Sequence, residues 1–256
     1  MIPMKPATGA QLWSLRNVLR EQPEATFEKL AAAGYTVVEP AGFNITELTI
    51  QGFKLQDLKN LADAHGLKII SGHFQLEIDN APVALELAAQ LGMKYFVVFN
   101  LKDELKVSLA GYKAAASELN KVGELARSYG IQIGYHNHAH EFTKIDGLLP
   151  FDLLLDYTDP ELVVFQPDLG WLGYAGQNPE KLFERYPGRF PLWHLRDIDA
   201  ETKKTTAIGG GVIDFKSAIA NRELAGLEYA LVEMASDTED PLGKILSSHP
   251  VIENWF

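Results

Sequence analysis

Short apolar segments alternate with segments of helical spacing along the whole chain, and this alternation constrains the fold more than any other feature. Strand character covers residues 9–14, 35–39, 67–71, 95–99, 131–135, 162–165, 190–195 and 229–233. Helical spacing covers residues 23–33, 55–65, 81–91, 108–129, 179–186, 215–224 and 241–250. Strands that alternate with helices run parallel and are joined by right-handed crossovers, and eight such units close into a barrel. Residues 1–256 are therefore predicted to form one α/β domain, a (β/α)8 TIM barrel.

An open, doubly wound parallel sheet is the other fold that is compatible with this alternation of strands and helices. Such a sheet usually carries a glycine-rich loop after its first strand, and no such loop follows residues 9–14 in this sequence. Gly209, Gly210 and Gly211 lie instead between the seventh and eighth predicted strands, where barrels often bind phosphate. A flexible loop explains this glycine run equally well.

Charge and cysteine content narrow the classes of partner. The formal net charge of −11 describes a surface that repels phosphate backbones, so we expect no nucleic-acid partner. The chain has no cysteine, which excludes disulfides and thiolate metal ligands. Residues 1–10 lack the apolar region of a signal peptide, and no stretch approaches the roughly 18 apolar residues of a membrane span. We expect a soluble cytoplasmic protein with no membrane partner, and a homodimer is a further expectation.

One stretch concentrates side chains that bind metals. Residues 135–142 read YHNHAHEF and hold three of the seven histidines together with Glu141. They follow the predicted strand 131–135, so imidazoles and a carboxylate gather at a strand end. Neutral nitrogen and anionic oxygen donors on a rigid support are what a divalent metal requires. A solvated, histidine-rich loop would have the same sequence pattern. The residues at the other strand ends therefore decide between a metal site and a solvated loop.

The other predicted strand ends carry the same kinds of side chain. In a TIM barrel the C-terminal ends of the strands meet at one mouth, where the active site is built. The polar residues at or just beyond these ends are Glu39, His73, His136, Asp168, His194 and Glu233. The last four are each separated by about one β–α unit, so four successive strands could surround one ion.

Each of these residues also has a structural explanation when it is taken alone. Asp168 precedes Leu169 and Gly170 and could cap a helix. His194 follows Trp193 in an apolar strand and could be a core histidine, while Glu39 could cap a loop. Their coincidence at one mouth favours the metal site.

Several aromatic residues lie near the strand ends and could wall a pocket at the same mouth. Aromatic faces suit the apolar side of a sugar ring, although core packing explains most aromatic residues equally well. The residues concerned are Trp13, Phe43, Phe74, Phe99 and Trp171.

The sequence also resembles a known family. The segments that carry the resemblance are residues 11–16, 34–39, 135–142, 168–176, 186–189 and 194–197. In this order they are similar to the xylose-isomerase-like (AP endonuclease family 2 type) sugar phosphate isomerase/epimerase family, and the resemblance runs from about residue 10 to 245. It implies a TIM barrel that binds one divalent ion, Mn, Co or Zn with Mg as a further option, at the ends of strands five to eight. The implied ligands are His136, Asp168, His194 and Glu233.

The chain departs from the family pattern at two positions. Ketose 3-epimerases of the wider group usually have glutamate where this chain has His136, and two glutamates facing across the substrate act there as base and acid. Arg196 stands where many relatives have lysine. Members with histidine-rich motifs at strand five include dehydratases and enzymes that act on 3-keto sugars. The departure leaves the type of reaction open.

Our first functional hypothesis is a metal-dependent isomerase or epimerase acting on a sugar, sugar phosphate or keto sugar through a metal-stabilised enediolate. Glu233 or His138 would take the proton next to the carbonyl, and Glu141 would act as acid. The residues predicted to contact the carbohydrate are Glu39, His73, Trp13, Arg196 and Trp171.

Three other functions remain open at this point. A lyase or dehydratase acting on a 3-keto sugar, glycoside or inosose would use the same ion and expel a β-substituent. Phosphodiester hydrolysis on the same fold is disfavoured by the negative charge. A non-catalytic sugar-binding protein would catalyse no exchange of solvent protons into a bound sugar.

Overall fold

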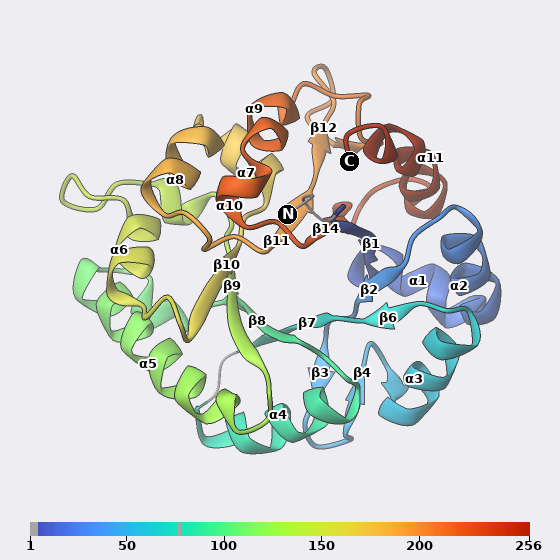
Figure 1. Ribbon diagram of the computed structural model, residues 1–256, viewed down its shortest axis with the longest axis horizontal. Coiled ribbons are helices and arrows are strands. Elements are labelled where there is room, and N and C mark those ends of the chain that lie inside the picture. Colours follow the sequence, from blue (N-terminus) through green and yellow to red (C-terminus); the bar gives the residue numbers. More distant parts are fainter. Residues whose placement is uncertain (1–4, 76–77) are drawn as a thin grey trace.

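The eight strand positions form a closed parallel barrel (Figure 1). The computed structural model describes residues 5–75 and 78–256, so residues 1–4 and 76–77 of the expected domain lie outside the described part. The barrel strands are β1 (Ala7–Gln11), β2 (Val37–Glu39), β6 (Lys68–Ile69), β7 (Ser71–Gln75), β8 (Tyr95–Asn100), β9 (Gln132–His136), β10 (Val163–Gln166), β11 (Leu192–Leu195) and β14 (Tyr229–Val232).

Hydrogen bonds between neighbouring strands close the ring. The strands pair in parallel in two runs, β11-β14-β1-β2-β6 and β10-β9-β8-β7. The bridges Ala41–His73 and Asp168–His194 join the two runs at both ends. The predicted TIM barrel is therefore confirmed, and the open sheet is excluded because a closed ring has no free edge strand.

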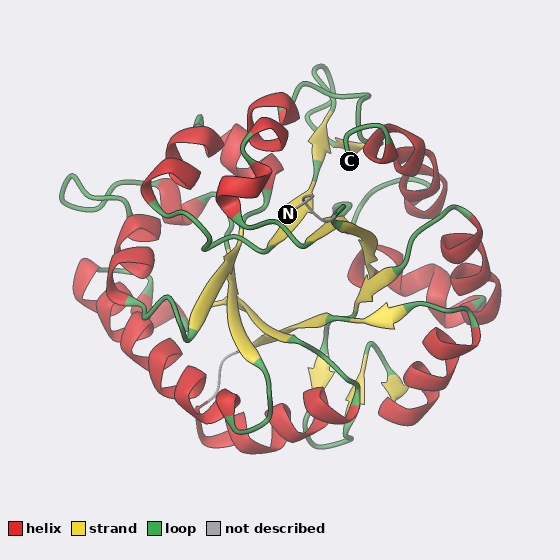
Figure 2. Cartoon of the chain, in the orientation of Figure 1, coloured by secondary structure: helices red, strands yellow, loops and turns green. Residues whose placement is uncertain are grey.

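Helices surround the barrel as an outer ring (Figure 2). They are α1 (Arg16–Glu21), α2 (Pro23–Ala32), α3 (Leu55–Ala64), α4 (Ala81–Gln90), α5 (Leu109–Arg127), α6 (Pro150–Tyr157), α7 (Leu169–Tyr174), α8 (Pro179–Arg185), α9 (Phe215–Ala220), α10 (Arg222–Ala225) and α11 (Pro241–Glu253). The sequence pattern missed α1 and α7, which are too short to show a helical period, and α6, whose apolar run reads equally as a strand. None of the described helices has the length and apolar character of a membrane span.

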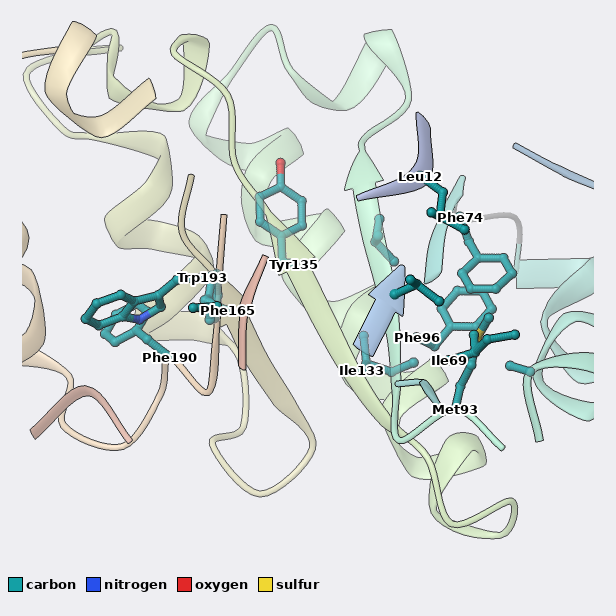
Figure 3. Packing of buried hydrophobic residues seen from close by; sticks show 14 of the residues in the cluster. Leu12, Ile69, Phe74, Met93, Phe96, Ile133, Tyr135, Phe165, Phe190 and Trp193 are labelled. Carbon is teal, nitrogen blue, oxygen red and sulfur yellow. The ribbon is translucent and has the colours of Figure 1, made fainter. Parts of the chain in front are cut away.

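Two apolar layers lie on opposite sides of the barrel wall. Alternate strand residues point inward and form a small cluster of Val37, Ile70, Tyr95, Val97, Val164, Leu192 and Leu231. Their neighbours along the strands point outward and pack against the helices, as Trp193, Phe165 and Phe96 do in Figure 3. This period of two sets which side chains face the barrel interior.

The predicted strand boundaries are wrong at two positions that bear on the mouth. The first strand ends at Gln11, and a 3₁₀ helix (Leu12–Leu15) follows, so Trp13 leaves the sheet. The predicted strand at residues 67–71 divides into β6 and β7, and His73 lies within β7 rather than beyond a strand end. Short antiparallel strands outside the barrel, β3 (Phe43–Asn44), β4 (Thr49–Ile50), β5 (Phe53–Lys54), β12 (Asp197–Ile198) and β13 (Thr205–Thr206), were not predicted.

Candidate metal centre

Strand alternation places acids and histidines directly above the inner apolar layer. Glu39 follows Val37 by two residues on β2, and a period of two turns both side chains into the barrel. The same spacing relates His194 to the inner Leu192. The spacing of two also relates Glu233, just after β14, to the inner Leu231. The polar layer therefore lies at the C-terminal mouth, where barrels build their sites.

Four of the predicted residues come together. His136, Asp168, His194 and Glu233 are buried, and each offers one ligand atom within 4.8 Å of the others. His136 Nδ1 is buried and has no hydrogen-bond partner among the described residues. Burial, followed by the charge of His194, lowers the pKa of His136, so its ring is neutral and keeps a lone pair. Two imidazoles and two carboxylates suit a divalent ion such as Zn, Co or Mn, so these residues fit the predicted metal.

His194 lies between two carboxylates. Its Nδ1 is 2.6 Å from Glu233 Oε2, and its Nε2 is 2.7 Å from Glu39 Oε1. Burial alone would lower the pKa of His194, but the two carboxylates outweigh it and raise the pKa to about 10. For Glu39 and Glu233, burial acts in the opposite direction and would raise the pKa. The cationic neighbours of the two carboxylates outweigh burial and hold both pKa values well below the usual range.

Glu39, on β2, contacts side chains from three other strands of the barrel, β7, β10 and β11. Its fully buried carboxylate contacts His194 and also His73 Nε2 at 3.1 Å. Gln166 donates from Nε2 to Glu39 Oε2 at 2.8 Å, and the hydroxyl of Ser71 donates to the same oxygen. Hydrogen bonds of this kind orient the ring of a ligating histidine. Gln166 was not predicted from the sequence, although its place two residues after the inner Val164 on β10 is the signal that could have found it.

Arg196 is engaged by the carboxylates of the cluster. Its Nε donates to Asp168 Oδ2 at 2.7 Å, and its Nη2 lies 2.9 Å from Glu233 Oε2. The guanidinium also lies over the ring of Trp171, 5.3 Å from the centroid. Asp168 Oδ1 in turn accepts from the backbone N–H of Trp171, so Asp168 caps α7 as well as joining the cluster.

A cavity of about 240 Å³ lies beside the cluster. Its lining residues are Gln11, Trp13, Ala41, Gly42, His73, Phe99, His136, His138 and Glu233. Pockets for drug-sized ligands run to roughly 300–1,000 Å³, so this cavity suits a smaller molecule. Trp13 and Phe99 are the predicted aromatic residues that line it, and Gln11 was not predicted.

Two of the aromatic residues predicted to line the cavity lie away from it. Phe43 and Phe74 pack against each other, with ring centroids 5.6 Å apart, and line a separate hollow of about 140 Å³. Phe74 also stacks on Phe96 in the outer apolar layer. The prediction that Phe43 and Phe74 wall the site is therefore wrong, because β7 continues past the expected strand end and turns Phe74 outward.

Glu141 and His138 lie on the loop after β9, in different surroundings. Glu141 is fully buried, accepts from the hydroxyl of Tyr135 at 2.6 Å and from the backbone N–H of His138 at 2.9 Å. Burial raises the pKa of Glu141 to about 7. His138 lines the cavity, its Nδ1 is buried without a partner among the described residues, and burial lowers its pKa.

The glycine loop of residues 209–211 is bound by a carboxylate of the chain itself. Asp197 Oδ2 accepts from the backbone N–H groups of Gly209 at 2.9 Å and Gly211 at 3.0 Å. Its Oδ1 accepts from the N–H groups of Ile198 and Ile213. A phosphate at this loop would have to displace the Asp197 carboxylate, so the structure does not support phosphate binding there.

Replacing Asp197 with alanine is expected to destabilise the protein by about 1–3 kcal/mol, because the buried N–H of Ile198 loses its partner, whereas the partly buried N–H groups of the loop can turn to water. Asp197→Asn keeps one oxygen acceptor in the same shape and should lose less. The midpoint of urea unfolding measures both effects. An alanine variant that unfolds at the wild-type midpoint would contradict the structural role of this carboxylate.

Comparison with known proteins agrees with the fold. The family model of the xylose isomerase-like TIM barrel matches residues 27–246. Proteins named inosose dehydratase are 27% identical, the one from Lacticaseibacillus casei over 75% of this chain and 81% of its own length. The one from Clostridium beijerinckii matches over 61% of this chain and 63% of its own length.

Solved structures show the same fold. A sugar phosphate isomerase/epimerase from Parabacteroides distasonis is 25% identical with a TM-score of 0.81, and the match covers 98% of this chain and 94% of that one. An IolI protein with a bound zinc atom has 16% identity and a TM-score of 0.76, with 98% and 99% covered. The closed barrel and the family model agree, and the chain belongs to the xylose isomerase-like TIM barrel family.

Proposed function

We propose that the protein is a divalent-metal-dependent lyase that eliminates water from a polyhydroxylated ketone, such as a keto sugar or an inosose. The observation that carries this proposal is the ring of His138, which lines the cavity beside the metal cluster. The names of the relatives that are 27% identical support the same reaction.

His136, Asp168, His194 and Glu233 would hold the ion. When bound, the ion would stabilise the negative charge that develops on the carbonyl oxygen as the neighbouring carbon loses its proton. Glu39 keeps the ring of His194 oriented, and Arg196 balances the charge of the two ligating carboxylates. Trp13 and Phe99 pack against the C–H face of the substrate ring.

His138 would perform both proton transfers. Because burial lowers its pKa, the ring is neutral at physiological pH and can accept the proton next to the carbonyl. The carbon–carbon double bond then forms, the β carbon–oxygen bond breaks, and the imidazolium returns the proton to the departing hydroxyl as water. One histidine on one face of the substrate is enough for this sequence.

Isomerisation or epimerisation is the second proposal, supported by the similarity to the Parabacteroides distasonis protein. Epimerisation needs proton-transfer groups on both faces of the substrate. Glu141, the predicted acid, is bonded to Tyr135 and to the backbone of His138 and is not among the cavity-lining residues. For this reason, and because the relatives that are 27% identical are named inosose dehydratase, we propose elimination ahead of epimerisation.

The two reactions are separated by incubating the protein, loaded with Mn, Co or Zn, with inososes, ketohexoses and 3-keto glycosides in deuterated water. Elimination should produce a conjugated carbonyl that absorbs in the ultraviolet and a product lighter by one water. Replacing His138 with alanine should lower kcat by about 10²–10⁴-fold, while the ion held by His136, Asp168, His194 and Glu233 stays bound. Deuterium exchange with an epimeric product and no loss of water would favour the second proposal.

A further inference from the structure

A second group of metal-binding side chains lies on the loop after β9. His138, His140 and Glu141 each offer a ligand atom, and these atoms lie within 4.8 Å of one another. His140 Nε2 is 3.3 Å from Glu141 Oε1. Two ligands of a tetrahedral zinc ion, with bonds of about 2.0–2.1 Å, are separated by about 3.3–3.4 Å. The pair already has the separation that a shared ion requires.

The donors in this group have lone pairs available. His138 Nδ1 is buried and unpaired among the described residues. Burial lowers the pKa of His140 to about 4, so this ring is neutral at physiological pH. Each oxygen of Glu141 accepts one hydrogen bond, from Tyr135 or from the backbone of His138, and retains a further lone pair.

The surroundings of this group leave it open to an ion from solvent, but they also lower the affinity of the group for that ion. The side chain of His140 is 39% exposed, so an ion could reach the group from solvent, and water would complete its coordination. Two cations act on the group: Arg196 on His138, and Lys106, whose ammonium group contacts Asp103 and Asn100, on His140 and Glu141. Three donors with one carboxylate, near a lysine, form a weaker site than the buried group of two histidines and two carboxylates.

We propose that His138, His140 and Glu141 form a second, weaker divalent-metal site for an ion such as Zn²⁺, and that filling it inhibits the enzyme. An imidazole that gives one nitrogen to a metal keeps its proton on the other nitrogen. His138 could then no longer accept a proton in the cavity. The metal site stands on geometry alone, whereas the inhibition rests on the proposed function.

Titrating Zn²⁺ into the chelator-treated full-length protein tests the site directly. Calorimetry or equilibrium dialysis should show two classes of site in the wild type. His140→Ala should weaken only the second class, by at least about tenfold, since even the loss of an outer hydrogen-bond partner costs about 10–100-fold. Glu141→Gln, which keeps the shape of the side chain, should act in the same direction. His65→Ala removes a histidine that pairs with Glu24 far from the loop and should change neither class.

Equal stoichiometry and affinity in the wild type and His140→Ala would overturn the second site. The inhibition is measured separately, as turnover during addition of excess Zn²⁺ to protein whose first site is filled. We expect the wild type to lose activity and His140→Ala to resist the loss. Equal inhibition of both proteins would overturn the inhibitory role even where two classes of site are found. If no substrate is turned over, the proposed function fails while the stoichiometry still decides the metal site.

Discussion

Replacing His194 with alanine is expected to lower the affinity for the first metal ion by more than about 100-fold, and with it any metal-dependent turnover. The reason is that His194 supplies one of four donors and also separates Glu39 from Glu233. Loss of an outer hydrogen-bond partner alone costs about 10–100-fold in metal affinity. In the variant the two glutamates lose a shared cationic neighbour, so the remaining donors are also disordered by repulsion.

Metal content after dialysis, measured by mass spectrometry on protein purified without an affinity tag, gives the result. The double variant His194→Ala/Glu233→Ala should retain less than either single variant. His249→Ala is the matched control, because His249 is also buried but packs edge to face against Tyr35, outside the cluster. Retention in His194→Ala equal to that in the wild type would show that the cluster is not the metal site.

The part of the site that could be predicted from sequence is the part governed by local periodicity. Glu39, His194 and Glu233 lie two residues beyond inner apolar residues, so strand alternation alone brings them to the mouth. His136 and Asp168 keep the same alternation, since His136 lies two residues after Gly134 on β9 and Asp168 lies four residues after the inner Val164 of β10. The order of strands then brings these residues together, because consecutive β–α units are neighbours in a barrel.

The part that could not be predicted depends on partners far apart in the chain. Arg196 is visible in the sequence as a charge, but its pairing with Asp168 and Glu233 depends on how two strands pack. The role of Asp197 depends on a loop that folds back on it over more than ten residues. Burial of Glu141 beneath Tyr135 likewise arises from tertiary packing, which overrides the polar appearance of the YHNHAHEF stretch.

Metal binding is expected to release a proton, and its affinity should rise with pH. In the ion-free protein the two glutamates hold the pKa of His194 near 10, so the ring carries a proton at neutral pH. A metal requires the unprotonated ring, so metal and proton compete for His194. Below pH 10 each unit rise in pH removes nine tenths of the competing protons, and the apparent affinity should rise about tenfold per unit.

Replacing Glu39 with glutamine tests this competition, because it removes one of the two charges that raise the pKa of His194 while leaving the side chain's shape. The variant should release a smaller fraction of a proton per ion near pH 8, and its affinity should stop rising at a lower pH. Calorimetric titration with Mn²⁺ or Co²⁺ in buffers of different ionisation enthalpy counts the protons. The same linkage predicts that the ion-free wild type loses stability as pH rises through about 10, since a raised pKa stabilises the folded state only while the ring is protonated. An affinity that stays constant between pH 6 and pH 9 would mean that His194 carries no proton between Glu39 and Glu233.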